Sequence, residues 1–256
     1  METIKASNMC FDNTTKRSKD SVKYIVIHYT ANNGDTASGN GNYFKVGGTF
    51  EKAVNSGKSN KAGAHFFIDQ KGNIVNSVDI SRTAWSVGGG LYSDIAKTGG
   101  GKYYKTVTNA NSVSIELCDI ALKNPSVSMI DATKKCIKYI RKNCKNANIV
   151  VRHFDITGKH CPAPMMKDAV WKKFLSDIGE SKSYVAPMIN PVTKEFKVQI
   201  IVPSLTIRKA GKSNAAVTGE VRVGEVYTIT EKKDGWGKLK SGAGWININT
   251  KYVRMV

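Results

Sequence analysis

Three residues of the types that bind transition metals stand close to apolar segments of this chain. His28 and His153 each follow an apolar run, and Cys161 comes shortly after His153. Two imidazoles and one thiolate are zinc ligands, and a set of three leaves the fourth tetrahedral position open, as in catalytic zinc sites. Each histidine alone is more often a hydrogen-bonded core or rim residue. The combination predicts one open zinc site.

Glu116 and Lys159 are the best candidates for the other groups that a catalytic zinc site requires. Bound zinc activates water and polarises a carbonyl, but hydrolysis also needs a carboxylate that carries a proton to the leaving group. In Ser112–Leu117 the residues alternate, which places Glu116 on the polar face of a strand. Lys159 precedes Cys161 and is placed to donate to a developing oxyanion. The plainer alternatives are a solvated glutamate and an ordinary surface lysine.

Strand and helix patterns alternate over the first 180 residues and predict an α/β fold with a mixed central sheet flanked by helices. Continuous apolar runs bounded by polar residues are typical of buried strands, and they cover residues 24–28, 64–69, 112–117 and 149–151. Apolar residues at helical spacing cover 42–55, 128–144 and 165–178, the last ending at Gly179.

Several ordered segments resemble the type-2 N-acetylmuramoyl-L-alanine amidases, a family that includes peptidoglycan recognition proteins and amidase-type phage lysozymes. The segments are Ile25–Ala31, Ala64–Gly72, Ser112–Leu117, His153–Asp155 and Lys159–Pro162. The resemblance implies the zinc amidase fold and one zinc ion held by His28, His153 and Cys161. It also implies Glu116 as the acid/base carboxylate and Lys159 as the cation near the oxyanion.

Two positions depart from the pattern of that family. Some members have a catalytic tyrosine where this chain has Ala64, so Glu116 is left to carry the proton transfer alone. Many members have a histidine after an Ala-Trp pair, but Ala84-Trp85 is followed here by Ser86. The substrate contact of that histidine is therefore in doubt.

A glycine-rich stretch at Val87–Lys102 has aromatic residues around it. Such long loops often line binding grooves, the alternative being an insertion without contacts. We expect Trp85 and Tyr104 to contact substrate, together with His65, which either faces the cleft or packs beneath it. His160 is expected to be only a neighbour of the ligand loop.

The C-terminal part resembles the bacterial SH3 domains of wall hydrolases. A proline-bearing segment predicts a linker at 181–195, which separates an amidase domain at 1–180 from an all-β, SH3-like barrel at 196–256. The resemblance rests on two Gly-Trp steps and on the order of five strand-like runs, at 196–202, 205–211, 224–229, 234–239 and 244–246. Tyr227, Trp236 and Trp245 are candidates for binding the wall, although aromatic residues in so small a barrel more often belong to the core.

The charge balance points to a polyanionic partner. Formal net charge is +19; residues 1–180 hold 26 Lys and Arg against 15 Asp and Glu, and residues 181–256 hold 13 against 5. A basic surface over both parts attracts polyanions. Anionic wall polymers and the carboxylates of bacterial peptidoglycan suit the zinc site better than nucleic acid, which we do not expect as a partner.

The five cysteines do not predict a disulfide framework. Cys136 and Cys144 fall on one predicted helix, about 12 Å apart, too far for a bond. Cys118 shares the strand face of Glu116, either near the metal or as a packed thiol, and Cys10 lies in a stretch without clear periodicity.

The N-terminal residues lack the apolar region of a secretory signal peptide, and no run is long enough to span a membrane. These features predict synthesis in a bacterial cytoplasm and release to the cell wall through a separately encoded pore protein.

These observations favour a peptidoglycan hydrolase that cuts the amide between the lactyl group of N-acetylmuramic acid and L-alanine, in the role of an endolysin or autolysin. A cytosolic recycling amidase would also lack a signal, but it has no need of a wall-binding domain. Two alternatives remain open. One is a recognition protein that binds muropeptides without cutting them, and the other is a Cys/His peptidase that uses Cys161 with His153 and leaves His28 idle.

Overall fold

The computed structural model describes residues 1–181, 195–233 and 235–256. The chain divides into two compact units, Met1–Ala186 and Pro187–Val256, which are described separately. Residues 182–194 of the predicted linker lie outside the described residues. Within the described part, no helix is both long enough and apolar enough to cross a membrane.

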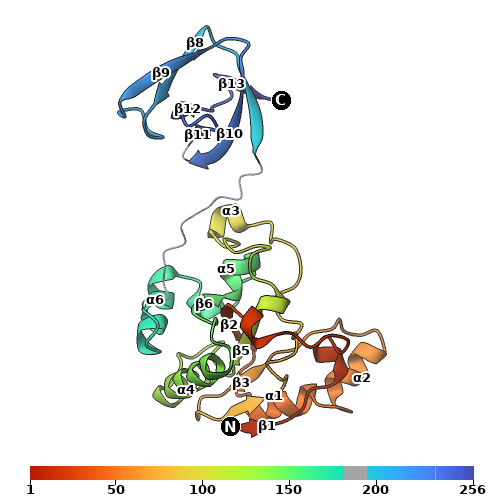
Figure 1. Ribbon diagram of the computed structural model, residues 1–256. Helices are drawn as coiled ribbons and strands as arrows, with labels where there is room; N and C mark the ends of the chain where they lie inside the picture. Colours follow the sequence, from red (N-terminus) through yellow and green to blue (C-terminus); the bar gives the residue numbers. More distant parts are fainter. Residues whose placement is uncertain (182–194, 234) are drawn as a thin grey trace. The chain divides into compact units, whose positions relative to one another are not determined.

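A six-stranded mixed sheet forms the centre of the first unit (Figure 1). Strands β2, β3 and β6 join β5 in one parallel set, with β2 between β5 and β6, while β4 runs antiparallel to β3. This confirms the predicted mixed sheet, and each of the four predicted strand segments contains a strand, although β3 is shorter than the run at 64–69. In sheet order, the strands are β1 (Glu2–Thr3), β4 (Ile74–Asn76), β3 (Phe66–Ile68), β5 (Ser112–Leu117), β2 (Tyr24–Tyr29) and β6 (Ile149–Arg152).

Helices cover both faces of this sheet (Figure 1). α4 and α6 bury their apolar residues against Ile25, Ile27 and Ile115 on one face, whereas α1 packs against Phe67 and Val75 on the other. Alternation along β5 therefore turns Glu116 away from α4 and toward the α1 side. The helices are α1 (Ala37–Phe44), α2 (Thr49–Asn55), α3 (Ile95–Thr98), α4 (Val127–Asn143), α5 (His153–Thr157) and α6 (Asp168–Asp177).

Two predicted helices differ from the structure. The single helix expected at 42–55 was wrong, because the chain turns between α1 and α2 at Gly47 and Gly48. Gly47 has a φ of 70°, and a Cβ on Gly48 would lie 2.7 Å from the carbonyl oxygen of Tyr43. The helix expected at 165–178 begins later, at Asp168, after a short 3-10 turn at Ala163–Met165.

The second unit is an antiparallel seven-stranded sheet. Its order is β13-β7-β10-β11-β12-β8-β9, and Val198, Ile229 and Ile246 lie at the centre of its apolar core. Sequence patterns predicted five of these strands but missed β9 and β13. The strands are β7 (Phe196–Ile200), β8 (Ser204–Arg208), β9 (Val217–Arg222), β10 (Val226–Lys233), β11 (Trp236–Leu239), β12 (Trp245–Asn247) and β13 (Val253–Met255).

Candidate metal centre

The three predicted metal ligands come from three different segments that meet at one edge of the sheet. His28 lies near the carboxyl end of β2, and His153 is the first residue of α5, directly after β6. Parallel pairing of β2 with β6 brings their carboxyl ends to the same edge. Cys161 arrives from the loop after α5, and the Phe154 backbone N–H donates to the Cys161 carbonyl over 2.8 Å.

A buried ion pair fixes the junction that carries His153. The Asp155 carboxylate accepts from the Arg152 backbone N–H at 2.9 Å and from the Arg152 guanidinium at 2.7 Å. The same guanidinium donates to the carbonyl oxygens of Met165 and Met166, each at 2.8 Å. These hydrogen bonds connect the start of α5 to the loop that follows it, so they hold the two segments in one relative orientation.

Gly158 ends α5, and the chain turns there toward Lys159 and Cys161. Its φ of 80° is in the left-handed region that favours glycine. A Cβ there would lie 2.3 Å from the Ile95 side chain, so the close packing of α3 on this turn also requires glycine.

The geometry of His28, His153 and Cys161 fits a metal ion. Their ligand atoms all lie within 4.8 Å of one another, and all three residues are buried. Nε2 of His28 and both ring nitrogens of His153 are buried without a hydrogen-bond partner. Buried polar atoms are normally satisfied, and a shared cation would take one nitrogen from each ring. The donor set of two imidazoles and one thiolate suits zinc.

Protonation in the metal-free protein agrees with this donor set. Burial lowers the pKa of His28, and burial together with the charge of Lys159 lowers the pKa of His153 to about 3. Both imidazoles are therefore neutral, which is the form that binds a metal. Burial raises the pKa of the Cys161 thiol to about 12, so its deprotonation requires a nearby cation.

Glu116 lies beside this cluster, paired in register with His28 across β2 and β5. Its Oε2 atom is buried and has no hydrogen-bond partner. Burial raises the pKa of Glu116 to about 7, and Asp35 adds to the rise while Lys159 opposes it. A carboxyl whose pKa lies near neutrality can both accept and donate a proton at working pH.

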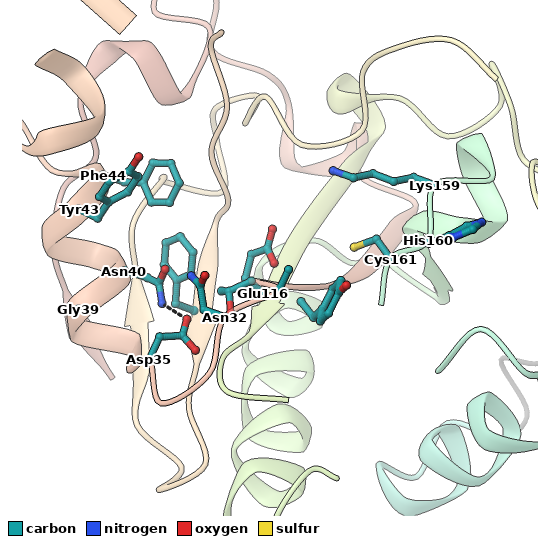
Figure 2. Close-up of a pocket in the computed structure, with 14 residues that line it drawn as sticks. Asn32, Asp35, Gly39, Asn40, Tyr43, Phe44, Glu116, Lys159, His160 and Cys161 are labelled. Atoms are coloured by element: carbon teal, nitrogen blue, oxygen red, sulfur yellow. Dashed lines mark hydrogen bonds between the residues drawn. The ribbon is translucent and has the colours of Figure 1, made fainter. Parts of the chain in front are cut away.

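Two clefts meet at Lys159, which lines both of them. A cleft of about 610 Å³ borders Glu116 and Cys161, and one of about 360 Å³ borders His153 and Trp85. Figure 2 shows Glu116 in the middle of the larger cleft, with Lys159 and Cys161 on one side of it. The proposed metal site thus lies between two spaces open to a ligand.

His65 does not reach either of these clefts. It is fully buried. Nδ1 lies 3.0 Å from the Ser114 backbone nitrogen, while Nε2 lies 3.1 Å from the Arg82 carbonyl oxygen and 2.9 Å from the Arg17 guanidinium. Both ring nitrogens have protein partners, so His65 packs beneath the site and offers no free atom to a substrate.

The other predicted substrate contacts lie on the His153 side. Trp85 lines the smaller cleft, and its buried Nε1 has no hydrogen-bond partner. Tyr104 lines a separate hollow of about 220 Å³, which shares Gly88 and Gly89 with that cleft. His160 is exposed beside Cys161, and its Nε2 lies 2.8 Å from Asp94 Oδ2.

The remaining cysteines are free, buried thiols. Cys118 packs in the apolar cluster under α1, and Asn40 Nδ2 lies 3.5 Å from its sulfur. It is outside the group of ligand atoms formed by His28, His153 and Cys161. The sequence left open whether Cys118 lies near the metal or is a packed thiol, and its surroundings are those of a packed thiol.

The three aromatic candidates of the C-terminal sheet lie in two environments. Tyr227 packs against the core, and its hydroxyl donates to Glu225 at 2.9 Å. Trp236 and Trp245 are half-buried diagonal neighbours on β11 and β12. A Cβ on Gly211 would lie 3.1 Å from Trp236 and 3.0 Å from Trp245, so this glycine lies against both.

Sequence reasoning missed the residues that line the clefts away from the metal ligands. Asp35, Asn40 and Tyr43 contribute to the larger cleft, and Lys61 and Asn109 to the smaller one. None of them ends an apolar run or belongs to a recognised motif. No local pattern in the sequence would have identified them, because they come from separate segments that only the fold brings to the two clefts.

Comparisons with known proteins agree on one family. The family model described as N-acetylmuramoyl-L-alanine amidase matches residues 18–164. The amidase CwlL of Bacillus licheniformis is 28% identical over 154 residues, covering 58% of this chain and 38% of CwlL. The amidase CwlH of Bacillus subtilis is 30% identical over 162 residues, covering 62% of this chain and 53% of CwlH. The chain therefore spans roughly two fifths to a half of these relatives.

One of the similar solved structures is a mutant endolysin from Bacillus subtilis. It has a TM-score of 0.48 and 22% sequence identity, and the match covers 70% of this chain and 97% of that one.

Proposed function

Because the chain belongs to the N-acetylmuramoyl-L-alanine amidase family, we propose that it hydrolyses the amide between the lactyl group of N-acetylmuramic acid and L-alanine in bacterial peptidoglycan. The observation that carries this proposal is the group of three buried ligand atoms beside a carboxyl with an unpartnered oxygen. Metal-assisted amide hydrolysis uses a Lewis acid and a proton carrier within reach of one bond, and this edge of the sheet offers places for both.

In the proposed site, His28, His153 and Cys161 hold one zinc ion. When bound, zinc supplies Lewis acidity that polarises a carbonyl and makes water acidic near neutral pH. Glu116 takes a proton from the attacking water and passes it to the leaving nitrogen, so that the amine departs neutral. Lys159 donates to the oxygen that gains negative charge in the tetrahedral intermediate.

Specific observations favour the amidase over the two alternatives that the sequence left open, a thiol peptidase and a recognition protein. A thiol peptidase needs a reactive thiolate, but burial raises the pKa of Cys161 to about 12. A recognition protein has no need of a glutamate next to the ligand atoms whose Oε2 is buried without a partner. Chelation separates the first alternative, because a thiol peptidase should keep its activity without metal.

We propose that the C-terminal sheet is an SH3-like module that binds the cell wall, with Trp236 and Trp245 as its contact residues. The support is their half-exposed, adjacent placement and the basic composition of residues 181–256. Anionic wall polymers are the proposed additional partner. The proposed setting is lysis, with the protein made in the bacterial cytoplasm and released to the cell wall through a separate pore protein.

Mass spectrometry of digested wall tests the reaction. Purified peptidoglycan treated with the zinc-loaded protein should release stem peptides with a new N-terminal L-alanine, while the glycan strands stay intact. A matched digest with Glu116→Gln should release almost none. New reducing sugar ends, or cuts within the peptide, would assign the protein to another class of wall hydrolase.

A further inference from the structure

The larger cleft beside Glu116 has walls of opposite charge. Lys159 and Cys161 lie on one wall, and Figure 2 shows Asp35 and Asn40 across the cleft from them. A ligand that fills this space of about 610 Å³ therefore meets a cation at one end and a carboxylate at the other. A ligand with unlike charges at its two ends would therefore bind in one orientation.

Asp35 is held rigidly in the opposite wall. Its Oδ1 accepts from the Asp119 backbone N–H at 2.6 Å, and its Oδ2 accepts from the Asn40 side-chain amide at 2.7 Å. These two donors come from different segments, so they fix the plane of the carboxylate. Each oxygen retains a further lone pair for a ligand.

The charge of Asp35 has no cationic partner within the described residues. Among the described residues, Asp20 and Asp69 also have no ion pair, so Asp35 is distinguished by its place in the wall of the cleft. The neighbouring Asp119 differs, since Lys123 Nζ lies 2.7 Å from its carboxylate. A half-buried carboxylate that lines a cleft without a cation of its own is suited to accept one from a ligand.

We propose that Asp35 recognises a free side-chain amino group on the stem peptide, at a residue beyond the bond that is cut. This inference rests on the proposed amidase function. In this proposal the reacting carbonyl is placed at the Lys159 end of the cleft, and the stem peptide is placed along the cleft toward Asp35. Stems with a free amine then bind better than stems whose amine is acylated, as it is in a cross-link.

Three synthetic muramyl tripeptides that differ only at the third residue test the proposal. They carry lysine, Nε-acetyl-lysine or norleucine, the last of which keeps most of the chain length but lacks the amine. Wild-type protein should prefer lysine to either analogue by about tenfold in kcat/KM, mainly through KM, since one charge-assisted hydrogen bond is at stake. Calorimetric binding to the zinc-loaded Glu116→Gln variant gives the same comparison without turnover.

Variants assign the preference to the carboxylate. Asp35→Asn keeps an oxygen acceptor but removes the charge, and it should reduce the preference for lysine to less than about twofold. Asp35→Glu keeps the charge and should retain part of the preference. Asp131→Asn is the matched control, because Asp131 is exposed on α4 and contacts only Lys134; it should preserve the full preference.

The outcomes separate this inference from the function on which it rests. No hydrolysis of any tripeptide by zinc-loaded protein would count against the amidase proposal itself. Equal hydrolysis of all three would leave the amidase and overturn the role of Asp35. The same fall in kcat for all three in Asp35→Asn, with KM unchanged, would mean that Asp35 acts only through the charge of Glu116, which also overturns the proposal.

Discussion

Two groups of buried histidines in the same domain have opposite surroundings. His28 and His153 have ring nitrogens without partners, next to the sulfur of Cys161. His65 is equally buried, but both of its nitrogens meet protein groups. Burial lowers the pKa of all three. The difference teaches that burial and a shifted pKa do not distinguish a candidate ligand from a core histidine, whereas an unsatisfied ring nitrogen beside a second candidate ligand does.

Removing a metal ligand should have the largest effect and tests the comparison directly. We expect His153→Ala and Cys161→Ser to lose zinc and to lose hydrolysis by more than about a thousandfold, because a Lewis acid worth several kcal/mol is gone. His65→Gln should keep one zinc ion per chain. Elemental analysis of dialysed protein measures both. The comparison fails if a folded His65→Gln variant loses its zinc, or if metal-free protein remains fully lytic.

Glu116→Gln should bind zinc and wall normally but lose at least about a hundredfold in kcat, since it can no longer carry the proton. Lys159→Ala should lose a comparable factor through the oxyanion. Glu220→Gln, on the exposed side of β9, is the matched control and should retain activity. Turnover of Glu116→Gln close to the wild-type rate would mean that another group carries the proton.

The buried, neutral His65 should make the free energy of unfolding of the metal-free protein depend on pH. Burial and the charge of Arg17 lower its pKa from 6.5 to about 3. Between these values only the unfolded chain takes up the proton, so the free energy of unfolding falls as pH decreases below 6.5. One histidine contributes a slope of up to about 1.4 kcal/mol per pH unit.

His28 and His153 add to that slope in the same direction, whereas Glu116 opposes it because its pKa is raised. The difference in this slope between wild type and His65→Gln gives the contribution of His65 alone. Urea unfolding from pH 4.5 to 6.5 should show a slope smaller by about one proton in the variant. Parallel curves would mean that His65 is protonated in the folded protein.

The smallest effects are expected in the C-terminal sheet, which has no metal-ligand cluster within the described residues. Residues 196–256 should fold alone and bind purified cell wall, while residues 1–180 keep hydrolysis of soluble muropeptides. Trp236→Ala and Trp245→Ala should each weaken binding to the wall by about three- to tenfold.

Pulldown of residues 196–256 and of the two variants on purified wall, across a salt series, measures this binding. Binding that vanishes at moderate salt would reveal only a polycation, since exposed charges are screened within about 8 Å.

The sequence by itself predicted the elements that carry the chemistry. The apolar runs before His28 and His153 and the alternation around Glu116 are local patterns, and local patterns follow from burial and strand geometry. They identified β2, β5 and β6 within a residue or two. They failed at α1 and α2, where the conformation of Gly47 and Gly48 overrides the spacing of the apolar residues.

Only the tertiary structure decided which polar groups remain without partners. His65 and His153 both neighbour an apolar run, yet the packing of Arg17 and Ser114 satisfies one ring and leaves the other open. The cleft wall at Asp35 likewise depends on contacts with Asp119, far away in the chain. Hydrogen-bond satisfaction and charge pairing depend on distances between segments, and spacing along one segment does not encode those distances.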